Sequence, residues 1–440
     1  MALGRPLPAM RRRTGRRGWV GAANPREWPG WRGVALALGL LFLAEPGMGR
    51  ATQVGDSAPP RIPKSLEVTL RHAGIVGVVR FSPDGRHFLT AENHNLRYWD
   101  TSSRNPLFRW RLPTYNPVRR ERGGVVIDAV FSPDGRWVAA GDSSGIVGIW
   151  STSTGKPELP PLYAEWYAFS IVFSPNSDQL GVASGEKKLR LWRFGGRQAT
   201  VSEVPTPIPI SRVAYCPDGR AIAWGGDTYL GELSVANGRT REFVKPGTGR
   251  SGYVGSVQYS PNGQWLVAGA NDGLISIFDS RTGQVRIPER LHAGKPDEHI
   301  THLKFTRDST RLLTVAGNSA CVWQCATGRP TLPPLSHPQL VTDADFSPDG
   351  RWIATASQDG TVRLWDARSG RLVLAAWKHQ GAIWSLAFSP DGKRLLTGSD
   401  DRTAKLWRLP ITADLERLAV QRSARPGAPQ PSLPTSRRQR

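Results

Sequence analysis

A hydroxyl, an imidazole and a carboxylate occur close together in the C-terminal part of the chain, with a tryptophan after them. They are His337, Thr355, Asp359 and Trp365. A hydrolase can use such a trio, because a base activates a hydroxyl nucleophile and a carboxylate orients the base. The same residue types recur as His379, Thr397, Asp401 and Trp407. In both sets the hydroxyl lies ten residues before the tryptophan and the carboxylate six before it. A catalytic site is expected once, so the repetition favours a structural role.

Two short markers recur along most of the chain and keep the same phase. The first is "FSPDG", which begins at Phe81, Phe131, Phe346 and Phe388, with variants that begin at Phe173, Tyr215, Tyr259 and Phe305. The second is a large apolar residue 18 or 19 positions later, at Trp99, Trp150, Trp192, Leu233, Phe278, Trp323, Trp365 and Trp407. Eight copies in phase indicate one structural unit repeated eight times.

Within a unit, apolar residues alternate with period two, as in half-buried strands. The segments "AIWSLAF" (382–388), "RLLTGS" (394–399) and "TAKLW" (403–407) have the length of strands, and "SPDG" is typical of a turn. An outer strand follows the tryptophan, for example "RLVLAA" (371–376). Each unit is therefore predicted to be a four-stranded antiparallel meander, which buries both faces only when units stack around an axis.

The phased "FSPDG" and Trp-Asp markers, with a His before the first strand, resemble the WD-repeat β-propeller family over residues 66–408. The resemblance implies an all-β fold, a single eight-bladed β-propeller of four-stranded antiparallel blades, which we place at residues 65–410. In that family the His, Ser/Thr, Asp and Trp of a repeat form a hydrogen-bonded chain. The two sets above match this pattern and are expected to be structural. The pattern decays elsewhere, with Ser144 at the Asp position of the second unit and Leu233 at the Trp position of the fourth.

The chain has one strand too few at its C-terminal end and one too many at its N-terminal end. No good outer strand follows Trp407, whereas "SLEVTLRH" (65–72) precedes the first unit. We expect this N-terminal strand to pair with the last blade and close the ring, which removes exposed sheet edges. Outer strands are also expected to contain "ELPPL" (158–162) and "TLPPL" (331–335), because proline is tolerated at sheet edges.

The first 51 residues are typical of a signal peptide or another N-terminal targeting segment. Arg-rich sequence leads into the apolar run "GVALALGLLFLA" (33–44), which is shorter than the roughly 20 residues that span a bilayer. We expect a linker at 52–64, export to the periplasm or the extracellular space, and no spanning helix after processing. An uncleaved membrane anchor, or a later start codon such as Met10 with a cytoplasmic product, stays an alternative. Residues 411–440 are predicted to form a short helix and then a disordered basic tail.

The formal net charge of +22 is spread unevenly. Residues 1–64 carry +8 and residues 409–440 carry +4, which leaves +10 on the body. Cys216, Cys321 and Cys325 do not suggest a disulfide framework, and no zinc-ligand spacing is present. The sequence therefore predicts a moderately basic propeller without a cofactor or a metal.

Insertions between the units indicate where binding is expected. The longest steps contain segments 111–124, 245–253 and 291–300, and all three enlarge the face on which one unit leads into the next. Long loops on a rigid scaffold commonly carry function. The candidate partner-binding residues are Arg119, Arg120, Arg122, Trp166, Lys245, Arg250, Lys295 and Trp384. Packing between blades is the alternative role for the aromatic residues, and a solvated surface is the alternative for the basic ones.

The leading functional hypothesis is a non-enzymatic scaffold, a monomeric propeller whose loop-rich, basic face binds an acidic protein or peptide. The alternative is a propeller enzyme or small-ligand-binding protein with a site at the axial channel. Such a site needs convergent His, Asp or Glu, and those that the pattern assigns mostly belong to the hydrogen-bonded chains or to "SPDG" turns. Nucleic acid is disfavoured because no basic and aromatic binding motif is present, and export would separate the protein from it.

Overall fold

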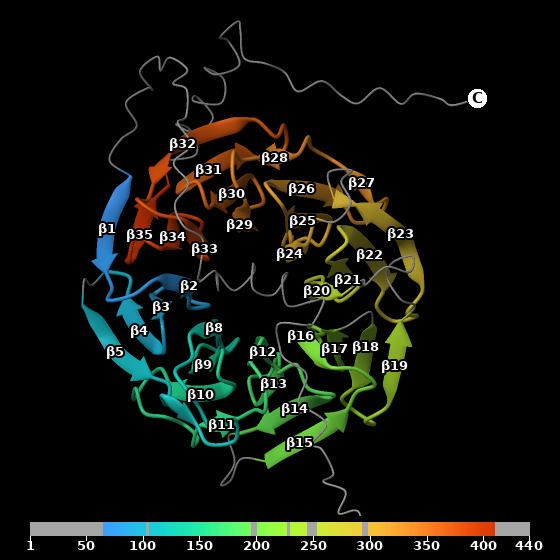
Figure 1. The fold of residues 1–440 in the computed structure, drawn as a ribbon. Coiled ribbons are helices and arrows are strands. Elements are labelled where there is room, and N and C mark those ends of the chain that lie inside the picture. Colours follow the sequence, from blue (N-terminus) through green and yellow to red (C-terminus); the bar gives the residue numbers. More distant parts are fainter. Residues whose placement is uncertain are drawn as a thin grey trace, which may run out of the picture.

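The computed structural model describes residues 65–102, 105–194, 200–226, 229–243, 253–292 and 298–409. These residues form eight small antiparallel sheets, or blades, arranged in a ring around a central axis (Figure 1). The predicted all-β, eight-bladed propeller is confirmed. The targeting segment, the linker and the C-terminal tail lie outside the described residues. Within the described ranges, no helix has the length and hydropathy needed to cross a membrane.

The blades follow one another along the chain, and the first-named strand of each is the innermost. Blades 1 and 2 contain β2 (Val76–Phe81), β3 (His87–Glu92), β4 (Asn95–Asp100), β5 (Pro106–Arg111), then β8 (Val126–Phe131), β9 (Trp137–Asp142), β10 (Ile146–Ser151), β11 (Leu162–Tyr163). Blades 3 and 4 contain β12 (Ser170–Phe173), β13 (Gln179–Ala183), β14 (Lys188–Arg193), β15 (Thr200–Pro205), then β16 (Ile210–Tyr215), β17 (Ala221–Gly226), β18 (Leu230–Ser234), β19 (Thr240–Phe243).

The second half of the ring repeats this order. Blades 5 and 6 contain β20 (Val254–Tyr259), β21 (Trp265–Ala270), β22 (Leu274–Asp279), β23 (Val285–Leu291), then β24 (Ile300–Phe305), β25 (Arg311–Ala316), β26 (Ser319–Gln324), β27 (Arg329–Pro330), with β28 (Leu335–Ser336) also paired to β26. Blades 7 and 8 contain β29 (Val341–Phe346), β30 (Trp352–Ser357), β31 (Thr361–Asp366), β32 (Leu372–Lys378), then β33 (Ile383–Phe388), β34 (Arg394–Ser399), β35 (Thr403–Arg408).

The N-terminal strand β1 (Leu66–Arg71) supplies the outer strand of blade 8, as predicted. It runs antiparallel to β35, with Leu70 opposite Ala404. Its start is fixed by polar contacts, because the carboxylate of Glu67 accepts hydrogen bonds from Arg394 at 3.0 Å and from Arg408 at 2.7 Å. The ring therefore closes through a strand that comes from the opposite end of the described chain.

Apolar packing between neighbouring blades holds the ring together. Each of the eight interfaces contains one hydrophobic cluster. The cluster between blades 8 and 1 joins Leu70 of β1 to Val76 and Trp99 of blade 1 and to Leu406 of β35. Full burial of one such side chain contributes about 1.5 to 3 kcal/mol, so the interfaces account for much of the stability.

The "SPDG" segments are tight turns between the first and second strands of a blade. In blade 1, the hydroxyl of Ser82 donates to Asp84 Oδ1 at 2.6 Å, and the backbone N–H of Arg86 donates to the same oxygen at 3.0 Å. Gly85 has φ of +68°, a backbone conformation that favours glycine. Asp84 therefore fixes the turn by local hydrogen bonds.

The two proline pairs interrupt the outer strands, which differs from the sequence prediction. In blade 2 the outer strand is reduced to β11, Leu162–Tyr163, directly after the prolines. In blade 6 the segment 331–334 separates β27 from β28. The physical reason is that proline has no N–H to donate to the neighbouring strand, so two in succession break the ladder even at an edge.

Candidate functional site

The His, Thr, Asp and Trp side chains of blade 7 are hydrogen-bonded to one another in a chain. The indole Nε1 of Trp365 donates to Thr355 Oγ1 at 2.8 Å, and His337 Nε2 lies 2.7 Å from the same oxygen. On the other side of its imidazole, His337 Nδ1 lies 3.3 Å from Asp359 Oδ2. The arrangement runs from a strand-3 tryptophan, through a strand-2 hydroxyl, to the turn between those strands.

Blade 8 repeats the same geometry. Its distances are 2.9 Å from Trp407 Nε1 to Thr397 Oγ1, 2.8 Å from Thr397 Oγ1 to His379 Nε2, and 2.9 Å from His379 Nδ1 to Asp401 Oδ2. Both histidine side chains and both threonines are 0% exposed. A nucleophile needs access to its substrate, so this burial supports a structural role, in which each polar group satisfies the next.

Burial and hydrogen bonding determine the charges in blade 8. Burial lowers the pKa of His379 to about 4, although the neighbouring Asp401 acts in the opposite direction. Burial alone would raise the pKa of Asp401, but hydrogen bonds from Thr403 and from the backbone of Gln380 lower it. The site therefore holds a neutral imidazole beside a carboxylate, with Nδ1–H donating to Asp401 and Nε2 accepting from Thr397.

Blade 6 contains a third chain that the sequence reasoning missed. Trp323 Nε1 donates to Thr314 Oγ1 at 2.9 Å, and His292 Nδ1 lies 2.9 Å from that oxygen. His292 Nε2 lies 3.2 Å from Ser319 Oγ, which takes the place of the carboxylate. In this blade the hydroxyl precedes the tryptophan by nine residues, because the turn is one residue shorter than in blades 7 and 8. A search that allowed nine as well as ten residues would have found it.

Blade 3 fills the corresponding place with an ion network, which the sequence reasoning also missed. Glu186 lies six residues before Trp192, at the Asp position of the pattern. Its Oε1 lies 2.6 Å from Arg190, whose Nε lies 2.9 Å from Glu203 Oε1. The side chains of Glu186 and Arg190 are only 5% and 6% exposed. A polar group is therefore kept at this position, but a salt bridge replaces the His–Thr–Asp–Trp chain.

Arg119 is held against the protein, unlike the two other candidate arginines of its loop. Its guanidinium lies 4.8 Å from the ring centroid of Tyr167 and 5.8 Å from that of Trp166, and it pairs with Glu121 at 2.8 Å. The Arg119 side chain is 9% exposed. The structure thus brings Arg119 and Trp166 together, in a contact that fixes the loop to the entry of blade 3.

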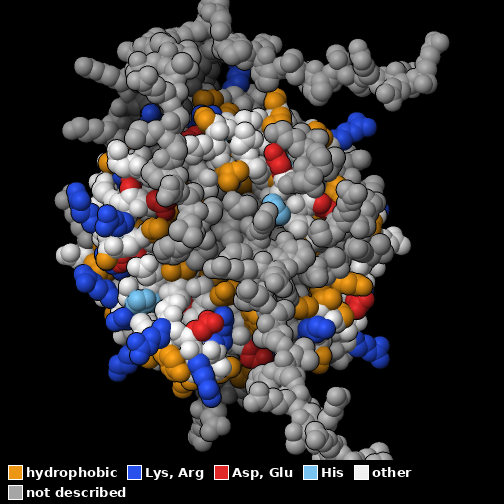
Figure 2. Space-filling view, viewed as in Figure 1, with side chains coloured by type: hydrophobic (Ala, Val, Ile, Leu, Met, Phe, Trp, Pro, Cys, Tyr) orange, Lys and Arg blue, Asp and Glu red, His pale blue; other side chains and the backbone are white. Residues whose placement is uncertain are grey.

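The other candidate arginines of this loop lie on a small exposed hairpin, β6 (Tyr115–Asn116) and β7 (Glu121–Arg122). Arg120 and Arg122 are exposed, and Tyr115 and Val118 of the same hairpin are 46% and 54% exposed. Figure 2 shows Lys and Arg side chains mainly around the rim of the face in view. Lys245, Arg250 and Lys295 lie outside the described residues.

Trp384 lies at a separate pocket, of about 280 Å³, and none of the other candidate residues that the structure describes lines it. Leu340, His302 and Gln358 are among its walls, so blades 6 to 8 share it. The Trp384 indole donates to Asp400 Oδ1 at 2.5 Å. The aromatic candidate therefore belongs to a different part of the loop-rich face from the hairpin.

The innermost strands also carry charged residues, which belong neither to the hydrogen-bonded chains nor to the "SPDG" turns. Arg80 lies 3.7 Å from Asp128 across the interface of blades 1 and 2, and His302 lies 4.0 Å from Asp343 across that of blades 6 and 7. Burial raises the pKa of Asp345, although the nearby Lys304 acts in the opposite direction.

Most of the acids near the axis have structural partners. Asp343 Oδ2 accepts the backbone N–H of Leu386 in the next blade at 2.9 Å, and Asp128 Oδ2 accepts that of Ile171 at 3.2 Å. In the part of the chain that the structure describes, no group of three or more His, Cys, Asp or Glu could hold a metal ion. The period-two pattern alone did not reveal which inner-strand residues turn toward the axis.

Comparisons with known proteins agree with this geometry. Five segments match the family "WD domain, G-beta repeat", at residues 64–100, 118–151, 241–279, 331–366 and 373–408. The chain is 23% identical over 272 residues to WD repeat-containing protein 1 of Xenopus tropicalis, covering 58% of this chain and 41% of that protein. It is 28% identical over 324 residues to the guanine nucleotide-binding protein subunit beta of Nicotiana tabacum, covering 67% and 81%.

Two further similarities concern length and fold. Actin-interacting protein 1 of Drosophila melanogaster is 25% identical over 260 residues, covering 56% of this chain and 39% of that protein, so the chain spans about two fifths of some curated relatives. The computationally designed protein Ika8 has a similar fold, with a TM-score of 0.64 and 18% identity, over 79% of this chain and 100% of that chain. With eight blades, five matching repeats and buried His–Thr–Asp–Trp chains, the chain belongs to the WD-repeat β-propeller family.

Proposed function

We propose that this propeller is a non-enzymatic scaffold whose loop-rich face binds a protein or peptide partner. The observation that carries the proposal is the hairpin β6–β7, which exposes two arginines and two apolar side chains on a firmly anchored loop. The relatives support it by their names, since one is an actin-interacting protein and another is a subunit of a larger protein. The buried hydroxyl–imidazole–carboxylate sets are not accessible for catalysis.

The base of the hairpin is rigid, which suits a docking element. Asn116 is 0% exposed, and its Nδ2 donates to the backbone oxygen of Ala164 at 3.1 Å. Its Oδ1 accepts the backbone N–H of Val118 at 2.9 Å. Because the loop is already ordered, a partner loses less affinity to loop ordering.

The exposed side chains define the chemistry of the partner. Arg120 and Arg122 favour carboxylates, and the adjoining Tyr115 and Val118 favour an apolar side chain. The partner is therefore an acidic segment that contains an apolar anchor. The pocket beside Trp384 offers a second contact, for an apolar group.

The test is affinity capture with the full chain and an Arg120→Ala/Arg122→Ala variant. The partner should be retained by the wild type and lost by the double variant. An Arg307→Ala/Lys393→Ala variant is the matched control, because it removes the same charge from exposed "SPDG"-type turns on the opposite face. Equal retention by all three proteins would exclude the hairpin. Arg119→Ala is kept separate, because its loss also loosens the loop.

A small-ligand site at the axis is the second candidate, favoured by the charged residues that the inner strands carry there. Arg80→Ala and Asp345→Ala would lower ligand affinity without affecting capture by the hairpin. We also propose export, which the Arg-rich and apolar N-terminal sequence supports. Cell fractionation tests it, and recovery of the full-length chain in the cytoplasm would contradict it.

A further inference from the structure

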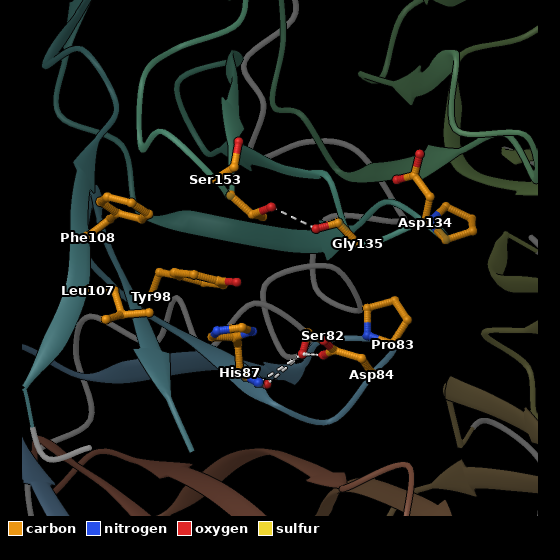
Figure 3. Close-up of a pocket in the computed structure, with 12 residues that line it drawn as sticks. Ser82, Pro83, Asp84, His87, Tyr98, Leu107, Phe108, Asp134, Gly135 and Ser153 are labelled. Atoms are coloured by element: carbon orange, nitrogen blue, oxygen red, sulfur yellow. Dashed lines mark hydrogen bonds between the residues drawn. The ribbon is translucent and has the colours of Figure 1, made fainter. Parts of the chain in front are cut away.

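A pocket of about 720 Å³ lies between blades 1 and 2, on the face of the "SPDG" turns (Figure 3). Blade 1 contributes Asp84, His87 and Tyr98, and blade 2 contributes Gly135 and Thr152. This face is opposite to the one that bears the hairpin β6–β7. The pocket is therefore independent of the proposed scaffold surface.

Aromatic rings form one wall of the pocket. The ring of Tyr98 stacks on that of His87, with centroids 4.9 Å apart, and on that of Phe108, with centroids 5.9 Å apart. Tyr98 is 4% exposed, yet Figure 3 shows its hydroxyl pointing into the open space between the two blades. Among the described residues, none is hydrogen-bonded to that hydroxyl. The hydroxyl is therefore available to a ligand that enters the pocket.

The corresponding gap between blades 6 and 7 is filled by an arginine side chain. There the guanidinium of Arg311 donates to the backbone oxygens of Gly350 and Ala367, both at 2.6 Å. The same guanidinium lies 5.3 Å from the ring centroid of Phe346. Between blades 4 and 5, Arg220 likewise reaches across and donates to Ser280 Oγ at 2.7 Å.

The repeat register relates these gaps residue by residue. Counted from the "FSPDG" marker, His87 stands where blade 6 has Arg311, and Gly135 stands where blade 7 has Gly350. Counted from the Trp marker, Thr152 corresponds to Ala367. Blade 1 therefore lacks the arginine that blade 6 places at this position, while the groups that receive Arg311 in blade 7 have counterparts that line the pocket.

The carboxylates beside the pocket suit a positive ligand. Burial would raise the pKa of Asp84, but hydrogen bonds from Ser82 and the Arg86 backbone lower it below the usual value. Burial, with Asp84 and Asp100 nearby, raises the pKa of Tyr98 to about 12, so its hydroxyl stays protonated. The pocket thus combines a carboxylate, carbonyl oxygens and aromatic faces, which together recognise a guanidinium.

We propose that the pocket between blades 1 and 2 binds the arginine side chain of a partner protein, in the position that Arg311 occupies between blades 6 and 7. The guanidinium donates to the backbone oxygens of Gly135 and Thr152 and stacks against the aromatic wall. The site binds a guanidinium in preference to an ammonium, because a planar group with several donors matches these acceptors and an ammonium makes fewer of the contacts.

The experiment titrates N-acetyl-arginine amide into the full-length protein and follows binding by saturation-transfer NMR. N-acetyl-citrulline amide, which has the same shape without the charge, should bind at least about tenfold more weakly. His87→Arg supplies the missing guanidinium from within the chain, so this variant should no longer bind the probe. A melting temperature at or above that of the wild type would show that it folds.

Two variants separate charge from loss of fold. Asp84→Asn should weaken binding severalfold and keep the turn, because Asn262 holds the equivalent turn of blade 5 through Ser260 at 2.7 Å. His87→Ala leaves the pocket open and should bind within a few-fold of the wild type. Equal binding by the wild type and His87→Arg, or equal binding of the arginine and citrulline probes, would overturn the proposal. The Arg120→Ala/Arg122→Ala variant should bind the probe like the wild type.

Discussion

Blades 7 and 3 satisfy the same buried position with different chemistry. Blade 7 uses a chain in which the imidazole of His337 contacts the carboxylate of Asp359, whereas blade 3 pairs Glu186 with Arg190 at 2.6 Å. The chain in blade 7 depends on which atom donates and which accepts each hydrogen bond, whereas the pair in blade 3 depends on opposite charges. The difference teaches that a blade requires satisfied polar groups beside the turn between its second and third strands, and that the residue types can vary.

The largest effect on stability is expected from opening the ring, because the ring holds blades 7 and 3 together in one cooperative unit. Deletion of residues 65–72 removes β1 and exposes the edge of β35. We expect the single unfolding transition to be lost, as measured by circular dichroism during heating. Glu67→Ala is the control, since it removes two ion pairs but keeps the strand. An unchanged transition in the deletion variant would refute closure by β1.

Loss of the tryptophan should come next. Trp365→Ala and Trp407→Ala should each lower the free energy of unfolding by about 3 to 5 kcal/mol through cavity formation, measured by chemical denaturation. The blades are distinguished by Trp→Phe changes, which remove the indole donor. Trp365→Phe should cost more than Trp192→Phe, because the residue ten positions before Trp192 is Val182, which offers no acceptor. Equal costs would mean that the hydrogen bond contributes nothing.

Acid should separate blade 8, which repeats the imidazole-containing chain of blade 7, from blade 3. The pKa of His379 is about 4 in the folded protein, below its usual value of 6.5, so the unfolded chain takes up the proton first as pH falls. The stability from His379 is therefore complete above pH 6.5 and is lost toward pH 4, by about 3 kcal/mol. Denaturation at several pH values measures this slope. His379→Gln should flatten it, and Arg190→Gln, in a blade whose network lacks imidazole, should not.

The smallest effect is expected at Asp359, the end of the hydrogen-bonded chain in blade 7. Asp359→Ala should lower the free energy of unfolding by about 1 to 3 kcal/mol, because His337 loses its acceptor. Asp359→Asn retains an acceptor oxygen and should cost less. Unchanged stability, together with loss of a hydrolytic activity, would show that the set is catalytic.

The fold could be read from the sequence because two markers stay in phase over eight units. The strand pattern, the four-stranded blades and the pairing of 65–72 with the last blade all follow from that register. The proline pairs lie at the outer edge as predicted, but the outer strands are interrupted there, because proline's preference for edges does not mean that a short strand survives two of them. The local chemistry of the residue, an absent N–H, decided the outcome.

The sites were harder to read, because they depend on which side chains meet across blades. The chain in blade 6 escaped a fixed spacing of ten residues, and the ion network of blade 3 uses Glu186 where the pattern has Asp. Arg119 was grouped with exposed arginines, yet Tyr167 and Glu121 hold it. Charges at the axis depend on the direction in which inner-strand side chains turn, which alternation does not reveal.

Pairing of β1 with β35 has a consequence for synthesis. The contact between Glu67 and Arg408 joins residues 341 positions apart, so β1 is synthesised long before the strand with which it pairs. Until then blade 8 lacks its outer strand and β1 has no neighbour, so both leave unpaired strand edges that can pair with other chains. Nascent chains should therefore depend on chaperones until β1 pairs with β35. A circular permutant whose chain begins between two blades should not need to wait for this pairing.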